Sequence, residues 1–186
     1  MVSEMFKVSW KGRPQPAERA RPRFSKNKDS YYMYNPPSYQ KYQKKLIDFF
    51  SKYSDDPELK KLFDKKRLIY GLSVKIIFRL VASTGKNQSS TGKNPFYGKR
   101  PDIDNLYKAV VDALFLSKGN QIEDGFLTDA DGEPIVDSKG DSLIKYKQKI
   151  DDSRVIHTEL LKLRVDDEDQ EGFTIIVRNV GREDIS

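Results

Sequence analysis

Two aspartates separated by one residue, Asp102 and Asp104, precede an apolar periodic segment in the stretch KRPDIDNLYKAVVDALF at residues 99–115. If Asp104 caps or begins a helix, its carboxylate lies near the positive N-terminal end of that helix. Asp102 precedes it in an extended segment, so both carboxylates can face one point. Mg²⁺ is commonly held by one or two carboxylates together with waters and substrate phosphate oxygens. The spacing therefore fits a site for a hard divalent cation that works on phosphate.

The same segment places Asp104, Lys108 and Asp112 at i, i+4 and i+8 of the expected helix. A lysine between two carboxylates fits a charged site, but it equally fits an N-cap followed by a solvated ladder of ion pairs. A second acidic pair, Asp151-Asp152, lies much later in the chain, just before a β-rich segment. It would supply a third carboxylate to a metal site, or it is an ordinary polar turn.

Periodicity predicts the elements that must position these residues. Apolar residues at helical spacing favour one helix from about Ser38, as N-cap, to Tyr53 and another from about Asp104 to Leu116, with a short helix from Asp56 to Phe63. Alternating or β-rich segments predict strands near residues 6–10, 68–82, 154–165 and 173–179, the second of them central. Residues 117–149 are polar, with DADGEP and DSKGD expected at hairpin turns. This order of elements predicts an α+β layer fold.

Charge divides the chain into a basic half and an acidic half. Residues 1–100 hold 23 Lys/Arg and 8 Asp/Glu, a net charge of +15, whereas residues 101–186 have a net charge of −9. Within the basic half, KGRPQPAERARPRF at residues 11–24 contains three prolines, which predict an extended loop without regular structure. A basic loop of this kind suits a polyanionic partner, because neutralising phosphates releases counterions.

Several classes of protein are excluded by composition. The chain has no cysteine and a single histidine, His157, so disulfides, thiolate zinc sites, a cysteine nucleophile and multi-histidine metal sites are all excluded. We expect His157 to be structural. No signal-like start and no apolar run of about 18 residues is present, so we expect a cytoplasmic protein that does not enter a membrane.

RPDIDNLYKAVVDAL followed by IDDSRV resembles the signature of RusA-type Holliday junction resolvases, and GRPQPAERARPRF followed by YNPPSYQKYQKKL resembles the basic loop and first helix of that family. The motifs occur in the family order over roughly residues 5–178. The resemblance implies a single RusA-like domain over residues 1–186, with a mixed sheet of about four strands packed against two main helices. It also implies a homodimeric, Mg²⁺-dependent endodeoxyribonuclease, with Mn²⁺ able to substitute, that makes paired symmetric nicks in four-way DNA junctions during recombination and repair.

By position, the resemblance implies metal ligands at Asp102, Asp104 and Asp152, with Lys108 as the further catalytic residue. Asp151 is the alternative member of its pair, and Asp112 is a supporting residue. Basic side chains expected to bind DNA are Arg19, Arg21, Arg23, Lys26, Lys28, Lys99 and Arg100. The tyrosines Tyr31, Tyr32 and Tyr34 either stack on unpaired bases or pack beneath the loop.

Two features depart from the family pattern. An insertion at about residues 116–149 stands where the family has a short link, and Arg154 replaces a glutamine. We also expect a short flexible tail at residues 180–186. Alternative functions are a non-catalytic junction-binding protein on the same scaffold, a nuclease for other branched DNA, or a partner protein that docks a basic surface through its acidic segments.

Overall fold

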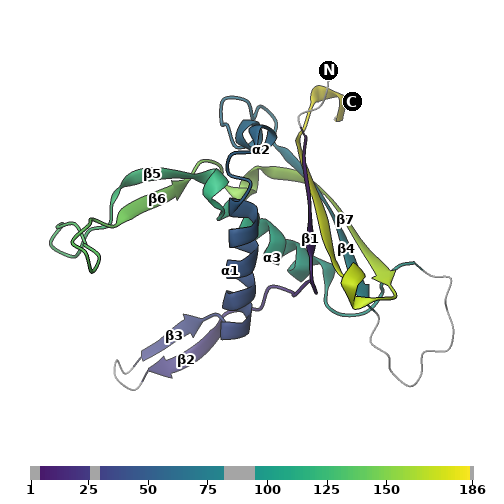
Figure 1. The fold of residues 1–186 in the computed structure, drawn as a ribbon, viewed down its shortest axis with the longest axis horizontal. Helices are drawn as coiled ribbons and strands as arrows, with labels where there is room; N and C mark the ends of the chain where they lie inside the picture. Colours follow the sequence, from purple (N-terminus) through teal and green to yellow (C-terminus); the bar gives the residue numbers. More distant parts are fainter. Residues whose placement is uncertain (1–4, 26–29, 82–94, 185–186) are drawn as a thin grey trace.

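The computed structural model describes residues 5–25, 30–81 and 95–184 (Figure 1). Its strands are β1 (Met5–Lys11), β2 (Arg21–Ser25), β3 (Ser30–Tyr34), β4 (Leu72–Val81), β5 (Gln121–Phe126), β6 (Ile144–Gln148), β7 (Val155–Val165) and β8 (Gly172–Asn179). The α-helices are α1 (Pro37–Ser51), α2 (Pro57–Leu62) and α3 (Ile103–Phe115). Single turns of 3-10 helix are η1 (Lys118–Asn120), η2 (Asp152–Arg154), η3 (Glu168–Gln170) and η4 (Arg182–Asp184).

Four strands form the main sheet in the order β1-β8-β4-β7. β4 is parallel to β7, while the other neighbouring pairs are antiparallel, so the sheet is mixed. β4 is buried along most of its length and lies in the interior of the sheet, which confirms the expected central strand. The α+β class and the four-stranded mixed sheet are therefore confirmed. That the whole chain is one domain stays a prediction.

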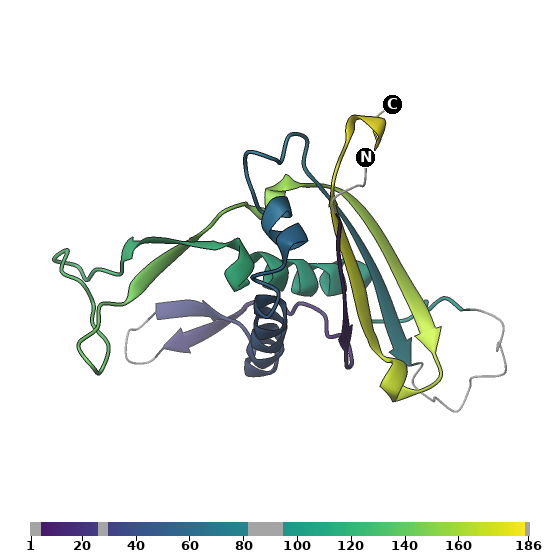
Figure 2. The ribbon, with the colours of Figure 1, turned by 45° about the horizontal axis from the view of Figure 1, so that its top comes forward.

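Helices α1 and α3 pack against one another beside the sheet (Figures 1 and 2). The buried residues of α1 recur every three to four positions because only one face of a helix meets the core; they are Tyr39, Tyr42, Leu46 and Phe50. Phe173 of β8 is fully buried and lies 5.5 Å from the Trp10 ring and 6.3 Å from the Phe50 ring, measured between centroids. The core thus joins the first strand, the first helix and the last strand.

The expected loop at residues 11–24 is only partly irregular, because its end pairs as a strand. β2 and β3 form an antiparallel hairpin in which Pro22 is opposite Met33. Proline cannot donate a backbone hydrogen bond, but a two-stranded hairpin has a free edge on each strand where no donor is needed. The prediction that proline forbids regular structure here was wrong for this reason.

The expected N-cap of the first helix was also wrong. The N-cap residue is Pro36, with no side-chain cap, and Pro37 occupies the first helical turn. Proline suits this position because its backbone nitrogen needs no partner there. The Ser38 hydroxyl instead donates a hydrogen bond of 3.3 Å to the carboxylate of Glu18 in the basic segment.

The insertion forms a two-stranded arm, β5–β6, that extends away from the sheet and helices (Figure 2). At its tip, Asp129 accepts backbone hydrogen bonds from Asp131 and Glu133, and Asp137 accepts them from Lys139 and Asp141. These two turns confirm that DADGEP and DSKGD lie at hairpin turns. No residue from 121 to 148 is buried. The arm therefore contributes no side chain to the core.

Replacing residues 127–143 with Asn-Gly should leave stability almost unchanged. Phe126 is paired with Ile144, so a two-residue turn closes the shortened hairpin. Exposed substitutions usually change stability by less than about 0.5 kcal/mol, which corresponds to a shift in Tm of roughly 2 °C for a chain of this size. Differential scanning calorimetry checks this expectation, and a fall in Tm of several degrees would show that the tip packs against the body.

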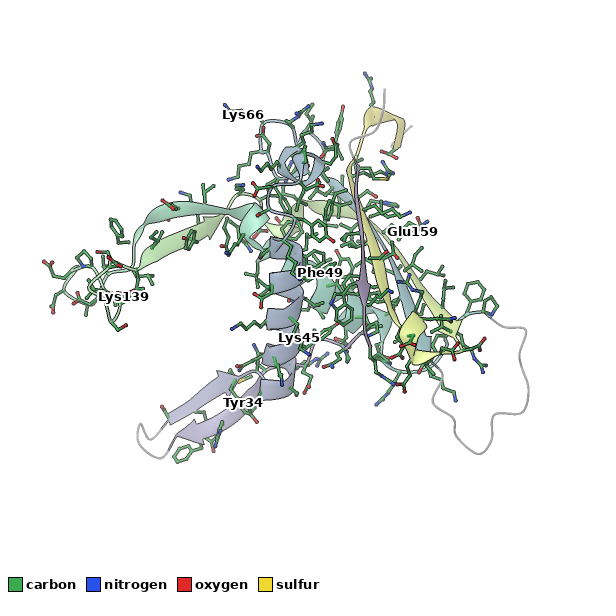
Figure 3. The ribbon with its side chains drawn as sticks, viewed as in Figure 1. Tyr34, Lys45, Phe49, Lys66, Lys139 and Glu159 are labelled. Carbon is green, nitrogen blue, oxygen red and sulfur yellow. The ribbon has the colours of Figure 1, made fainter. Side chains whose placement is uncertain are left out.

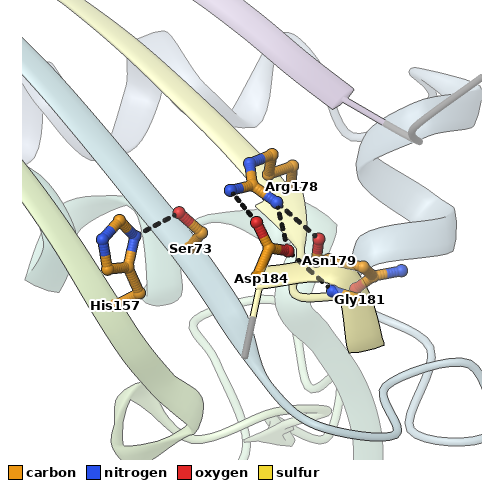
Figure 4. A network of polar contacts seen from close by, with 6 residues as sticks. All are labelled: Ser73, His157, Arg178, Asn179, Gly181 and Asp184. Carbon is orange, nitrogen blue, oxygen red and sulfur yellow. Dashed lines mark hydrogen bonds and ion pairs between the residues drawn. The ribbon is translucent and has the colours of Figure 1, made fainter. Parts of the chain in front are cut away.

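The segment after β8 is held by polar contacts (Figure 4). Arg178 donates two hydrogen bonds of 2.7 Å to Asp184, which also accepts one of 2.9 Å from the Gly181 backbone. These hydrogen bonds, those from Arg178 first, lower the pKa of Asp184 to about 2. Nearby, His157 Nδ1 and the Ser73 hydroxyl share a hydrogen bond of 2.9 Å between β7 and β4. Flexibility of the tail over residues 180–186 stays a prediction.

Among the described residues, no helix has both the length and the apolar composition needed to cross a membrane.

Candidate active site

Asp102 and Asp104 lie at the N-terminal end of α3. Asp102 is the N-cap residue, in extended conformation, and its side chain makes no capping hydrogen bond. Asp104 is in the first turn, and both residues are exposed. The helix therefore begins at Ile103, with Asp102 rather than Asp104 as its cap. Both carboxylates lie where the unpaired N–H groups of the helix favour negative charge, and that of Asp102 is not used by the helix itself.

Lys162 of β7 fixes the chain segment that leads into this helix. Its ammonium group donates hydrogen bonds of 2.8 Å to the Lys99 carbonyl and 2.9 Å to the Pro101 carbonyl. It also lies 5.6 Å from the centroid of the Tyr97 ring. Backbone bonds from Tyr97 to the Lys162 carbonyl and from Arg164 to the Pro95 carbonyl hold the same segment against β7. The position of Asp102 is thus set by contacts with the sheet as well as by the helix.

Lys108 lies one turn along α3 from Asp104. Its ammonium group is 2.9 Å from an oxygen of Asp112, and the side chains of Lys108 and Asp112 are 62% and 21% exposed. The expected i, i+4 ion pair between these two residues is therefore present. Because the lysine is largely exposed, it can leave the ion pair for a phosphate at little cost.

A buried asparagine joins the two ends of the arm. Asn120 is fully buried, and its side-chain amide donates hydrogen bonds of 2.9 Å and 2.8 Å to the carbonyls of Phe115 and Ile150. Its side-chain oxygen accepts one of 3.0 Å from the Ile150 backbone, and its own carbonyl accepts one from the Lys149 backbone. Asn120 therefore brings the returning chain back to the end of α3, immediately before Asp151.

Asp151 and Asp152, the second acidic pair, have different roles. Asp151 caps η2 by accepting a hydrogen bond of 2.9 Å from the Ser153 backbone, and its interactions with Ser153 lower its pKa. Asp152 lies close enough to α3 to influence Tyr107: burial raises the pKa of that tyrosine, and the negative charge of Asp152 raises it further. Asp151 is therefore used by the turn, whereas Asp152 is the member whose charge reaches the helix.

The three predicted metal ligands do not form one compact cluster. Over residues 5–25, 30–81 and 95–184, no group of three or more acidic or histidine side chains is close enough together to hold a metal ion. Asp102 and Asp104 nevertheless supply oxygen donors of the kind that Mg²⁺ accepts, and two carboxylates are enough when water and phosphate complete the shell. The donor set at the start of α3 therefore fits the ion, and a role for Asp152 as a third ligand stays a prediction.

The basic segment passes beside α3. The Ala17 backbone donates a hydrogen bond of 2.8 Å to the Asn105 carbonyl, which places the chain around exposed Arg19 near the two aspartates. Lys99 and Arg100 are exposed on the segment that precedes Asp102. Arg21 lies in β2, and Lys26 and Lys28 lie outside the described residues. Of the seven predicted DNA-binding residues, three therefore lie within a few residues of the α3 N-terminus or of the segment that contacts it: Arg19, Lys99 and Arg100.

The β2–β3 hairpin presents aromatic and basic side chains together. Tyr31 is 76% exposed and contacts the Phe24 ring edge-on at 5.2 Å between centroids. Arg23 lies over the Tyr34 ring at 5.9 Å. Tyr31 therefore has most of its ring free for stacking, whereas Tyr34 is half-buried.

Sequence reasoning missed two residues that position the site, Lys162 and Asn120. The alternation of β7 predicts the strand but not the carbonyl groups that Lys162 reaches. A single asparagine after a helix has no periodic signal of its own.

Comparison with known protein families gives a match to a nuclease family. The family model described as endodeoxyribonuclease RusA matches residues 12–145. The matched range contains Asp102, Asp104 and Lys108 and ends before the Asp151-Asp152 pair. No curated protein and no solved structure gives a significant match to the chain.

Proposed function

The chain belongs to the RusA family of endodeoxyribonucleases, and from this premise we propose that it resolves four-way DNA junctions by paired symmetric nicks. Mg²⁺ is the proposed ion, and Mn²⁺ is able to replace it. The proposed active form is a homodimer, because two opposed nicks in a symmetric junction require two active sites. We place this activity in DNA recombination and repair, with a cytoplasmic location.

One observation carries the proposal: two exposed carboxylates, one of them unused by its own helix, lie at the start of α3 with an exposed lysine one turn away. A purely DNA-binding surface has no need of carboxylates, which repel phosphate. A carboxylate pair that faces a polyanion is useful when a cation is held between them.

Each residue then has a distinct role. Asp102 and Asp104 would hold the ion, and Asp152, in the turn before β7, would be the third ligand. Mg²⁺, when bound, stabilises negative charge on the phosphate and activates water for hydrolysis. Lys108 turns from Asp112 toward the phosphate and offsets the negative charge that develops in the transition state. Until DNA binds, the ion pair with Asp112 holds the Lys108 side chain in place.

The basic residues bind and orient the DNA. Lys99 and Arg100 contact phosphates beside the cleaved bond, and Arg19 contacts them from the basic segment. Arg23, on the β2–β3 hairpin, extends this contact, and Arg21, Lys26 and Lys28 are proposed to contribute to it. Tyr31, with its exposed ring, stacks on an unpaired base at the centre of the junction.

The proposal is tested with a labelled synthetic four-way junction, a linear duplex and a flap, each incubated with Mg²⁺, Mn²⁺ or a chelator. We expect paired symmetric nicks in the junction that require the metal ion. Cleavage of the flap in preference to the junction would indicate a nuclease for other branched DNA. Binding without cleavage under all conditions would instead favour a junction-binding protein.

Replacing Lys108 with Gln should lower the cleavage rate about 100-fold, the lower end of the range for loss of one charge-stabilising group. Its ion pair is on the surface, so stability should change by less than about 1 kcal/mol. Single-turnover cleavage at saturating enzyme measures the rate. Asp112→Asn is the control, because it removes the same ion pair and keeps the lysine. An equal loss in both variants would show that the pair itself matters, and not the contact with phosphate.

Replacing Lys162 with Met should lower the cleavage rate about tenfold, because small displacements of positioned groups are costly. The loss should fall on kcat more than on KM, since Lys162 contacts backbone carbonyls and not DNA. Lys162→Arg, which keeps a donor, should recover part of the rate. Lys75→Met is the control, because Lys75 of β4 forms a 2.6 Å ion pair with Glu159 of β7, the strand that carries Lys162. Wild-type kcat in Lys162→Met would contradict the positioning role.

A further inference from the structure

Two adjoining hollows lie at the base of the arm. One, of about 370 Å³, is lined by Lys65, Leu68, Ile150, Asp151 and Arg154. The other, of about 430 Å³, is lined by Lys60, Phe63, Asp64, Lys65, Ile122, Lys147, Gln148 and Lys149. Lys65 belongs to both. The two hollows are therefore neighbours at Lys65, one beside the turn that carries Asp151 and the other beside β5 and β6.

The second hollow is strongly basic. Four lysines line it against a single acidic residue, Asp64. They come from two separate parts of the chain. Lys60 and Lys65 lie in and after α2, and Lys147 and Lys149 lie in β6 and immediately after it. We call Lys60, Lys65, Lys147, Lys149 and Arg154 the lysine track.

The lysines of the track are available to an outside anion. Lys60 is paired with Asp55, but the two side chains are 52% and 94% exposed, and surface ion pairs of this kind contribute little. Lys147 is paired with Asp124 and is 54% exposed. Lys149 is oriented by a hydrogen bond to the Gly119 carbonyl, next to the Asn120 contacts that close the arm. Lys66, which follows Lys65 in the loop after α2, projects outward from the body (Figure 3).

The acidic excess of the arm lies at its tip. Residues 129–141 carry five acidic residues and one basic residue, whereas Glu123 and Asp124 of β5 are balanced by Lys145 and Lys147 of β6 nearer the base. A polyanion would be repelled from the tip, whereas at the base it would meet the further lysines of the track. The charge distribution therefore favours a phosphate path across the base of the arm.

We propose that the lysine track binds the phosphate backbone of a duplex arm of the substrate as it leaves the active site. The inference rests on the proposed function, because it takes the DNA to be engaged beside Asp152. It assigns the base of the insertion to DNA binding, separate from the basic segment at residues 11–24 and the β2–β3 hairpin. The track adds to affinity at a distance from the cleaved bond.

The test compares Lys60→Gln/Lys65→Gln with Lys7→Gln/Lys75→Gln. Lys7 of β1 and Lys75 of β4 are both opposite Ile176 of β8, outside the track and the basic segment, so the control removes the same charge elsewhere. Binding of a fluorescent four-way junction is measured by anisotropy in chelator over a range of salt concentrations. Each lost phosphate contact lowers the slope of log K against log salt by about 0.9, so the track variant should lose about 1.8 and bind about tenfold more weakly. The control should match the wild type.

A junction with shortened arms locates the effect. With arms of about 6 base pairs, roughly 20 Å at 3.4 Å per base pair, the difference between wild type and track variant should shrink. A wild-type salt slope in the track variant, or an equal loss of affinity in the control, would overturn the lysine track. Cleavage of the junction by the wild type would still uphold the proposed function in that case. If the wild type neither binds nor cleaves the junction, both proposals fail.

Discussion

Replacing Asp102 with Asn is expected to lower the rate of junction cleavage on the order of 1,000-fold. The substitution keeps the size of the side chain but removes the carboxylate that the helix leaves unused. Charge stabilisation by a bound metal ion is worth several kcal/mol, and each 1.36 kcal/mol is a factor of ten in rate. Single-turnover cleavage in Mg²⁺ gives the loss, with melting temperature measured on the same sample.

A second measurement on the same variant separates a role of Asp102 in metal binding from a role in folding. Without metal, Asp102 repels phosphate, so Asp102→Asn should bind the junction at least as tightly as the wild type in chelator. Asp141→Asn in the arm tip is a matched control, because it removes one exposed carboxylate far along the chain from α3. A variant that loses both cleavage and junction binding would argue that Asp102 supports the local fold and not the metal ion.

Replacing Asn120 with Ala should destabilise the protein by about 3–5 kcal/mol. The substitution leaves the Ile150 carbonyl and N–H without their side-chain partner in a buried place, and it leaves the Phe115 carbonyl only the longer hydrogen bond of 3.3 Å from Gln148. Each buried polar group left unsatisfied costs about 1–3 kcal/mol. Because 1 kcal/mol shifts Tm by about 2–4 °C in chains of this size, the melting temperature should fall by roughly 10–15 °C.

Gln121→Ala is the matched control for Asn120. The neighbouring Gln121 side chain also donates to a backbone carbonyl, that of Leu116 at 2.9 Å, but in an exposed setting where water can replace it. Its loss should cost about 1 kcal/mol or less. Similar melting temperatures for the two variants would contradict the role of Asn120 in closing the arm.

The regular elements were predictable because burial imposes a period on the sequence. β4 alternates and lies inside the sheet, and α3 has an apolar face that includes Leu106, Val110 and Leu114. With these elements located, the placement of Asp102, Asp104 and Lys108 along one helix followed from local sequence alone. That part of the candidate site needed no knowledge of tertiary contacts.

The remaining features depend on partners far away in the chain. The Lys162 contacts with Lys99 and Pro101 join residues more than 60 positions apart, and the alternating pattern of β7 shows only that the lysine is on a strand. Asn120 looks like any polar residue after a helix until Ile150 is brought beside it. The β2–β3 hairpin was missed for a different reason. Proline disfavours a strand only where a neighbouring strand needs a hydrogen bond from its backbone nitrogen, so Pro22 did not rule out β2.

The pairing of β1 with β8 has a consequence for synthesis of the protein on the ribosome. The register joins Phe6 to Val177 and Val8 to Ile175, so β1 has its partner only after about 170 further residues have been made. At about 5–20 residues per second, that delay is on the order of 10–30 s. During translation the nascent chain therefore leaves the apolar side chains of Phe6 and Val8, and the edge of their strand, without a partner until β8 emerges.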